Sequence, residues 1–193
     1  MDAKWIFDRT ASFLGLICLC PILLIIAILI KIKMPGGPVI FQQVRVGKEG
    51  KLFTMYKFRS MQVIHSGSSI SIAGESRITP LGAVLRKYKL DELPELWNVL
   101  KGDMSLIGPR PLLVKYLPLY NNEQKRRHEV KPGITGWAQV NGRNAIDWDR
   151  KFQLDVWYVD HISLFLDMKI LYLTFLKVIK REGINNNSEV TMK

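Results

Sequence analysis

The sequence predicts a membrane-associated, α-dominated α+β fold, and three features of the chain support this class. Residues 11–30 form a long apolar run without a charge, two short runs are rich in β-branched and aromatic residues, and the C-terminal part has the periodicity of an amphipathic helix. We therefore expect three parts along the chain. These are a membrane helix at 1–33, a cytoplasmic domain at 34–183 and a disordered tail at 184–193.

The charge of the chain indicates anionic partners. Its 193 residues carry a formal net charge of +11, which suits nucleic acid, anionic lipid headgroups or phosphorylated substrates. The sequence contains no recognisable nucleic-acid-binding module, so we expect no nucleic acid partner. Both cysteines, Cys18 and Cys20, lie inside the apolar run. We expect them to pack there rather than to form a disulfide or a metal site.

The apolar run is long enough to enter a bilayer. A helix over 11–30 would measure about 30 Å, close to the thickness of a bilayer core. Pro21 lies in its middle, where proline removes a backbone hydrogen bond and kinks a helix. Basic residues flank both ends, so the positive-inside rule assigns no orientation. Two topologies fit: a kinked hairpin that returns to the cytoplasmic face, and a simple span with a tolerated proline.

Residues 39–46 and 52–60 are predicted to pair as a short β-hairpin. Both runs are rich in β-branched and aromatic residues, and the sequence Gly-Lys-Glu-Gly separates them. Lys57 and Arg59 are two residues apart in the second run, so both side chains would emerge on one face of a strand. This pair either faces a phosphate group or belongs to a solvated strand face, and the residues alone leave both interpretations open.

Two further helices are expected. Ile78–Lys89 ends in a basic cluster that includes Arg86. These charges either suit the C-terminal end of a helix, which favours cations, or form a basic rim beside the acidic residues that follow. Leu164–Arg181 interleaves apolar and basic residues as an amphipathic helix does. This second helix either packs on the domain or lies in the lipid headgroup layer.

Asp91 and Glu92 are the strongest candidates for chemistry. They precede a proline and an apolar periodic run that ends at Leu100, so Asp91 is predicted to be the N-cap of a helix. One interpretation is purely structural, because aspartate is a favoured N-cap. The other is catalytic. A helix N-terminus lowers the pKa of a nearby carboxylate and binds phosphate, an ionised aspartate can attack phosphorus, and its neighbour can bind Mg²⁺.

Two later segments add a cation and a glycine-rich stretch. Arg110 lies between Pro109 and Pro111, whose rings restrict the backbone and so direct the arginine side chain. A guanidinium group matches phosphate oxygens in pairs. The alternative for this arginine is a structural ion pair with Asp103. Residues 131–144 contain three glycines, which permit close approach of the backbone to a ligand.

As a set, these segments resemble the small monotopic phosphoglycosyl transferases of the bacterial sugar transferase family. The likeness runs from the membrane helix to about Gly183. The chain is similar in particular to the enzymes that transfer phospho-diacetylbacillosamine to start N-linked protein glycosylation. The motifs that carry the resemblance are Tyr56–Met61, Leu90–Pro94, Leu100–Ser105, Gly108–Pro111, Pro132–Gly136 and Val140–Asn144.

The resemblance implies a reaction and a location. The reaction is transfer of a sugar-1-phosphate from a UDP-sugar to undecaprenyl phosphate, with release of UMP and with Mg²⁺ as cofactor, as the first membrane step of glycoprotein or polysaccharide synthesis. The location is the bacterial inner membrane, with a re-entrant helix broken at Pro21, contacts with membrane lipids and the catalytic domain on the cytoplasmic face. Similarity implies UDP-diacetylbacillosamine as donor, and leaves UDP-galactose, UDP-glucose and UDP-N-acetylgalactosamine open.

The resemblance also implies roles for single residues. Asp91 would form a covalent phosphosugar intermediate, and Glu92 would assist by binding or orienting the metal, so both carboxylates are candidate metal ligands. The phosphates or the nucleotide would be bound by Lys57, Arg59, Arg86, Arg110 and Arg143. Two alternatives remain. One is direct transfer in a ternary complex, with Asp91 only a metal ligand, and the other is a non-catalytic membrane-anchored protein that binds anions.

Overall fold

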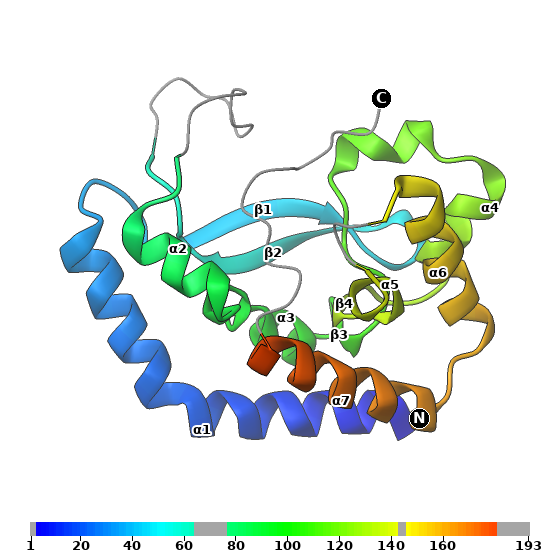
Figure 1. The fold of residues 1–193 in the computed structure, drawn as a ribbon, viewed down its shortest axis with the longest axis horizontal. Helices are drawn as coiled ribbons and strands as arrows, with labels where there is room; N and C mark the ends of the chain where they lie inside the picture. The colour runs from blue at the N-terminus through cyan, green and yellow to red at the C-terminus, as the bar shows by residue number, and fades with distance from the viewer. Residues whose placement is uncertain (1–2, 64–76, 143–145, 181–193) are drawn as a thin grey trace.

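The computed structural model describes residues 3–63, 77–142 and 146–180 and has the helix-rich α+β architecture that the sequence predicts (Figure 1). Arg143 and the predicted tail at 184–193 lie outside the described residues. The helices are α1 (Ala3–Lys33), α2 (Pro80–Lys87), α3 (Glu95–Lys101), α4 (Asn122–Lys125), α5 (Trp137–Val140), α6 (Trp148–Asp160) and α7 (Leu164–Lys180). The strands are β1 (Ile40–Val46), β2 (Leu52–Phe58), β3 (Ser105–Ile107) and β4 (Gly133–Thr135). The 3₁₀ turns are η1 (Lys48–Gly50), η2 (Leu90–Glu92), η3 (Val114–Leu119) and η4 (Arg126–His128).

Helix α1 forms one edge of the molecule. In Figure 1 it runs along the lower side from the N-terminus and then turns upward along the opposite flank. Pro21 lies inside the helix. An interior proline removes a hydrogen bond and clashes with the preceding turn, which accounts for a bend of this kind. By length and composition α1 can cross a membrane, and only 11% of its most apolar stretch is buried in the domain. The predicted long apolar helix is confirmed.

The two arms of α1, before and after Pro21, contact the domain through different chemistry. On the first arm Asp8 and Ser12 are buried one helical turn apart, and on the second arm Ile26 and Ile30 have the same spacing. The isoleucines join an apolar core that includes side chains of β2 and α2. The first arm therefore turns buried polar side chains towards the domain, although the Ser12 hydroxyl has no hydrogen-bond partner among the described residues, and the second arm packs through apolar side chains.

The hairpin of β1 and β2 is confirmed, and the two strands pair antiparallel along their whole length. The other edge of β2 is covered by the side chain of Asn98 on α3. Its Oδ1 accepts a hydrogen bond from the Tyr56 N–H at 3.0 Å, and its Nδ2 donates to the Thr54 carbonyl at 2.7 Å. The side-chain amide replaces the peptide group that a third strand would present, and it thereby holds β2 against α3.

Strands β3 and β4 are short and parallel, and they join two distant motifs, with Ser105 opposite Gly133. A Cβ atom on Gly133 would lie 2.1 Å from the backbone nitrogen of Gly108, and one on Gly136 would lie 2.2 Å from the Gly108 carbonyl oxygen. No side chain fits at either position. Two glycines of the stretch 131–144 therefore permit contact between two backbone segments, whereas the sequence predicts approach to a ligand.

The chain around Asp91 differs from the predicted helix start. Asp91 and Glu92 lie in the 3₁₀ turn η2, and α3 begins only at Glu95, with Pro94 at its N-cap position and no side-chain cap. Pro94 has no N–H, so it cannot donate the hydrogen bond that a continuous α-helix would make to the Leu90 carbonyl, and the turn is tighter instead. The prediction that Asp91 is an N-cap is wrong.

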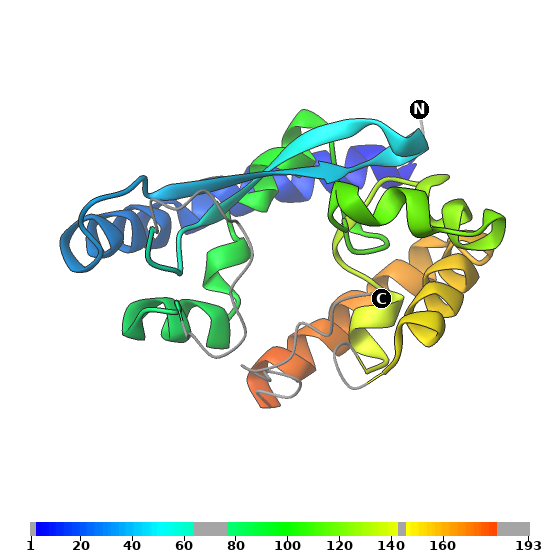
Figure 2. The same ribbon diagram turned by 90° about the horizontal axis from the view of Figure 1, so that it is seen from above.

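Helices α6 and α7 pack together on the β3–β4 pair, and α7 confirms the helix predicted at the C-terminal end. The shared core contains Ile107, Tyr158, Leu166 and Ile170. In Figure 1 α7 lies along the same lower side of the molecule as the first arm of α1, and in Figure 2 the two helices diverge from a common end.

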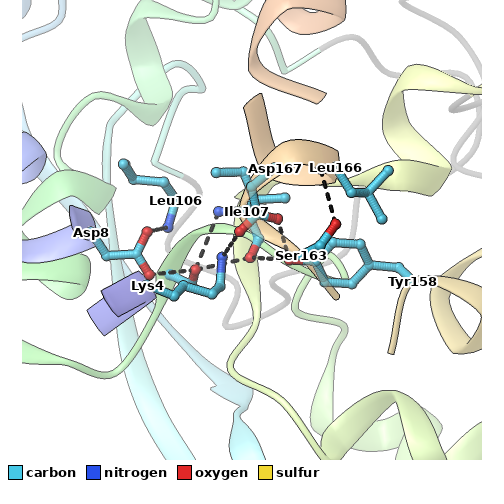
Figure 3. Close-up of polar contacts among 9 residues, drawn as sticks. Lys4, Asp8, Leu106, Ile107, Tyr158, Ser163, Leu166 and Asp167 are labelled. Atoms are coloured by element: carbon cyan, nitrogen blue, oxygen red, sulfur yellow. Dashed lines mark hydrogen bonds and ion pairs between the residues drawn. The ribbon is translucent and has the colours of Figure 1, made fainter. Parts of the chain in front are cut away.

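Figure 3 shows the polar contacts that attach the first arm of α1 at this common end. Asp8 accepts hydrogen bonds from the Ser105 hydroxyl at 2.7 Å and from the Leu106 N–H at 3.3 Å, which connects α1 to β3. One helical turn earlier, Lys4 Nζ lies 2.5 Å from Asp167 Oδ2 on α7. Two carboxylates, one on each helix, therefore set the place of the first arm.

Replacing Asp8 by alanine is expected to destabilise the domain by about 2 kcal/mol, because the Ser105 hydroxyl and the Leu106 N–H would lose a buried acceptor. Thermal unfolding of the detergent-purified protein measures this loss. Asp149→Ala, at an exposed position on α6, is the matched control and should change stability by less than about 0.5 kcal/mol. Equal stability of the two variants would show that Asp8 does not hold α1.

Candidate active site

Acidic and basic side chains from different elements meet beside η2. Lys57 Nζ on β2 lies 2.9 Å from Glu92 Oε1 and 3.0 Å from Glu95 Oε1. Arg110 Nη2, from the loop after β3, lies 2.6 Å from Glu92 Oε1. Glu92 and Glu95 are only 6% and 1% exposed. Since a buried carboxylate is costly without a cationic partner, these ion pairs hold together segments that are far apart in the sequence.

Arg110 does not form the structural ion pair with Asp103 that was the alternative to a phosphate-binding role. Asp103 pairs with Lys101 at 2.9 Å instead. The charge of Glu92 raises the pKa of Arg110, so its guanidinium group stays charged. The contact with Glu92 uses Nη2 of a group that has five N–H donors, and the side chain is 36% exposed. Arg110 is thus anchored at one nitrogen and partly open to solvent.

Asp91 lies beside these pairs but takes part in none of them. Although Asp91 is only 8% exposed, no other described residue forms a hydrogen bond or an ion pair with its carboxylate. Burial, reinforced by the neighbouring charge of Glu92, raises the pKa of Asp91, while Lys57, Arg86 and Arg110 oppose the rise. The lowered pKa predicted from a helix N-terminus is wrong, because η2 does not place Asp91 at one and burial dominates.

Glu92 and Glu95 have opposite pKa shifts. Burial works against the charge of Glu92, but Arg110 and Lys57 together outweigh it and hold the pKa of Glu92 well below its ordinary value. Burial raises the pKa of Glu95, and the shared Lys57 only partly opposes this. The cluster therefore contains one carboxylate that stays ionised over a wide pH range beside two, Asp91 and Glu95, that take up a proton more readily.

Arg86 belongs to this cluster and Arg59 does not. The charge of Arg86, on α2, acts on Asp91. The guanidinium group of Arg59 is buried near the end of α1, where it donates to the backbone carbonyls of Met34 and Gly37. Strand β2 ends at Phe58, one residue before Arg59. The alternation of side chains along a strand, which predicts that Lys57 and Arg59 share a face, therefore does not reach Arg59. Lys57, Arg86 and Arg110 are therefore the predicted cations that the structure brings together.

Glu95 and Asn98 are site residues that the sequence motifs do not single out. Glu95 follows Glu92 by three residues, a spacing that places two side chains on the same side of a helical turn, and this was the available signal. Asn98 had no comparable signal. Its partners Tyr56 and Thr54 precede it by 42 and 44 residues, so only the packing of β2 on α3 reveals the contact that places Lys57.

The site offers oxygen atoms for a divalent cation. Glu92 Oε2 is buried without a hydrogen-bond partner within the described part of the chain, and no side chain described there engages the neighbouring Asp91 carboxylate. Across residues 3–63, 77–142 and 146–180, no group of three or more His, Cys, Asp or Glu side chains is arranged to hold a metal. Mg²⁺ commonly uses one or two carboxylates and takes its other ligands from water and substrate phosphates. The residues present fit a metal that binds together with a phosphorylated substrate.

Comparison with known proteins shows one family and several close relatives. The family model described as "Bacterial sugar transferase" matches residues 1–181. The "Uncharacterized sugar transferase EpsL" of Bacillus subtilis is 55% identical over 191 residues, which are 99% of this chain and 94% of that protein.

Two longer relatives have names that describe a reaction. The undecaprenyl-phosphate galactose phosphotransferase of Salmonella typhimurium is 40% identical over 198 residues, covering 93% of this chain and 41% of that protein. The UDP-glucose:undecaprenyl-phosphate glucose-1-phosphate transferase of Escherichia coli is 41% identical over 185 residues, covering 88% of this chain and 39% of that protein. This chain spans about two fifths of the length of these two relatives, and the matched part includes the site.

Lys57→Met is expected to destabilise the domain by about 3–5 kcal/mol at neutral pH, because Glu95 stays buried without its cation. The loss should be smaller at about pH 5 than at about pH 7. The pKa of Glu95 is already raised in the folded state, and it rises further without Lys57. As the pH rises above the ordinary pKa of a glutamate, Glu95 therefore ionises in the unfolded chain before it ionises in the folded protein. The free energy of unfolding falls over that pH range.

Thermal unfolding at the two pH values measures both effects. Lys51→Met is the matched control, because Lys51 forms an exposed pair with Glu49 near the same strand and exposed pairs contribute little. Equal losses of stability in the Lys57→Met and Lys51→Met variants, or a larger loss for Lys57→Met at the lower pH, would show that Lys57 does not stabilise the buried charge of Glu95.

Proposed function

Because the chain belongs to the bacterial sugar transferase family, we propose that it transfers a sugar-1-phosphate from a UDP-sugar to undecaprenyl phosphate and releases UMP. The observation that carries this proposal is the state of Asp91. Its carboxylate is buried near cationic side chains, yet no other described residue forms a hydrogen bond or an ion pair with it. Its neighbour Glu92, by contrast, is held by two ion pairs. The names of the relatives from Salmonella typhimurium and Escherichia coli support the type of reaction.

In the proposed first step Asp91 is the nucleophile. One of its carboxylate oxygens attacks the phosphorus next to the sugar, an oxygen–phosphorus bond forms, the bond to the bridging oxygen of the diphosphate breaks, and UMP leaves with the electron pair. Lys57, Arg86 and Arg110 place positive charge where the leaving phosphate becomes more negative.

In the proposed second step the acceptor regenerates the enzyme. A phosphate oxygen of undecaprenyl phosphate attacks the same phosphorus, and the bond to Asp91 breaks with its electron pair returning to the carboxylate. The product is undecaprenyl diphosphate linked to the sugar. One cluster of cations serves both anionic substrates in turn, so a covalent intermediate removes any need for the two to bind together.

We further propose that Asp91 and Glu92 would hold Mg²⁺ when a phosphorylated donor is bound. The buried, unpaired Glu92 Oε2 supports this assignment. Lys57 and Arg110 both contact Glu92 Oε1, which fixes the carboxylate so that the second oxygen keeps one orientation. When bound, the ion would neutralise negative charge on the phosphate groups.

We also propose that α1 enters the inner membrane as a re-entrant helix and that α7 lies on the same cytoplasmic face among the lipid headgroups. Pro21 and the bend of α1 support the first point. The second is supported by the shared side on which α7 and the first arm of α1 lie (Figure 1) and by an exposed apolar stripe at helical spacing. The stripe consists of Leu164, Phe165, Met168, Tyr172, Phe175 and Ile179.

The site supports the reaction without selecting the sugar. The relatives named above carry galactose and glucose in their names, and UDP-diacetylbacillosamine remains the donor that the motif resemblance predicts. The reaction is a first step of both glycoprotein and polysaccharide synthesis, so it does not distinguish the two pathways. An assay with a panel of UDP-sugars identifies the donor.

Asp91→Asn is expected to lower UMP release by at least about a thousandfold, because the amide is a poor nucleophile at phosphorus. The measurement is UMP released by the detergent-purified protein with Mg²⁺, undecaprenyl phosphate and a panel of UDP-sugars. Asp149→Asn, exposed on α6, should be as active as the wild type, and both variants should sediment with lipid vesicles. Normal release by Asp91→Asn would overturn the assigned role, and no release by the wild type with any donor would favour an anion-binding protein.

A labelled sugar phosphate should become attached to the wild-type protein when undecaprenyl phosphate is left out. We expect about one UMP released per protein and one label bound, since the first step does not need the acceptor. Addition of undecaprenyl phosphate should remove the label, and Asp91→Asn should bind none. Turnover by a wild-type protein that never carries label would favour direct transfer in a ternary complex.

Chelation with EDTA should abolish UMP release, and added Mg²⁺ should restore it, because the phosphate charges need a cation that the protein does not supply in full. The unfolding temperature serves as the control and should not change on chelation. Full activity in EDTA would contradict the metal assignment and leave the nucleophile assignment intact.

A further inference from the structure

The loop that carries Arg110 is held through its backbone carbonyl groups. The prolines on both sides of Arg110 have no N–H, so carbonyl oxygens are the groups through which neighbouring donors hold this segment. The Gly133 N–H donates to the carbonyl of Pro109 at 3.0 Å. Arg45 Nη1 donates to the carbonyl of Pro111 at 3.4 Å. The carbonyl of Arg110 itself accepts a hydrogen bond from Arg127 Nη2 at 2.8 Å. Three consecutive carbonyls are therefore held from three separate segments.

Arg127, on η4, is in turn held by a buried carboxylate on α6. Arg127 and Asp155 are 3% and 4% exposed. The Nε and Nη2 atoms of Arg127 lie 3.1 Å and 2.7 Å from Asp155 Oδ2. The guanidinium group also lies over the ring of Phe152, 5.5 Å from its centroid. Carboxylate and ring together leave the arginine little freedom to turn away from the loop.

Stability alone is a weak reason for this buried pair. Moving an arginine and an aspartate out of water costs free energy that their attraction often fails to return, and apolar residues of similar volume frequently replace such pairs without loss of stability. Burial raises the pKa of Asp155 even with Arg127 adjacent, which agrees with an incompletely compensated charge. What an apolar pair would lose is the hydrogen bond to the Arg110 carbonyl.

We propose that Arg127 and Asp155 are positioning residues for Arg110. Asp155 orients the guanidinium group of Arg127, Arg127 holds the carbonyl of Arg110, and the backbone held there directs the side chain that pairs with Glu92. This inference rests on the proposed function, in which Arg110 binds a phosphate of the UDP-sugar. Arg127 and Asp155 are both buried, and Arg127 contacts the loop at the Arg110 carbonyl, so their effect on the reaction is expected to pass through Arg110.

The test is a double-mutant cycle between the buried pair and Arg110. The combined replacement Arg127→Met and Asp155→Leu removes both charges and keeps the space filled. We expect kcat/KM for UMP release to fall about tenfold to a hundredfold, as for loss of a hydrogen bond to a charged group, with the unfolding temperature within a few degrees of the wild type. In an Arg110→Ala background the same replacement should cause no further loss, because residues that act as a unit are not additive.

Arg126→Gln is the matched control. Arg126 is the neighbouring arginine on η4, and it pairs with the exposed carboxylates of Glu123 and Asp160, so its loss should leave UMP release unchanged. If the double replacement does not fold, Asp155→Asn, which keeps the shape of the side chain, takes its place in the cycle. The affinity for UDP, measured by calorimetry, is a second readout and should weaken in parallel with kcat/KM.

The outcomes separate this inference from the function on which it rests. Unchanged kcat/KM in the pair variant, or an equal further loss in the Arg110→Ala background, would overturn the positioning role while wild-type UMP release stands. A wild-type protein that neither binds UDP nor releases UMP would overturn the proposed function, and the positioning role with it.

Discussion

The contact of one lysine with two buried glutamates is the interaction on which the site depends. Lys57 on β2 reaches Glu92 on η2 and Glu95 on α3. Burying two carboxylates next to each other costs free energy, and Lys57, the cation that both carboxylates share, offsets this cost where the three elements pack together. The amide of Asn98 holds the same strand at neighbouring residues. The hairpin is thereby fixed at the place where its lysine is needed.

A consequence of this arrangement is that adjacent carboxylates have different environments. Glu92 is held by Lys57 and Arg110 and has a strongly lowered pKa, while Asp91 has no close partner among the described residues and a raised pKa. Neighbouring titratable groups whose pKa values are pushed apart are typical of sites that divide catalytic roles between them. Here the division separates a fixed carboxylate, suited to organising charge, from a free one, suited to attack.

The site and the apolar helix are connected through β3. Asp8 on the first arm of α1 bonds to Ser105 and Leu106 of this strand, and the strand leads directly into the loop that carries Arg110. On the other arm of α1, the core with Phe58 lies next to Lys57 along β2. Each arm is thus attached to an element that delivers one cation to Glu92. The elements that hold α1 are therefore the same elements that bring Lys57 and Arg110 to Glu92.

Local signals in the sequence were sufficient for the apolar helix, the hairpin and α7, because periodicity and turn residues act over a few residues. They also made Asp91, Glu92 and Arg110 candidates for the site, and the structure places these three residues close together. Local signals failed where the outcome depends on distant partners. Lys57 and Glu92 are 35 residues apart and Arg110 and Glu92 are 18 apart, and nothing local distinguishes Lys57 from Arg59, which binds carbonyls at the end of α1 instead. The sequence by itself determined which elements form and which charged residues are available. Only the tertiary structure decided which charges meet, because ion pairs and burial act over a few ångströms between segments that packing alone brings together.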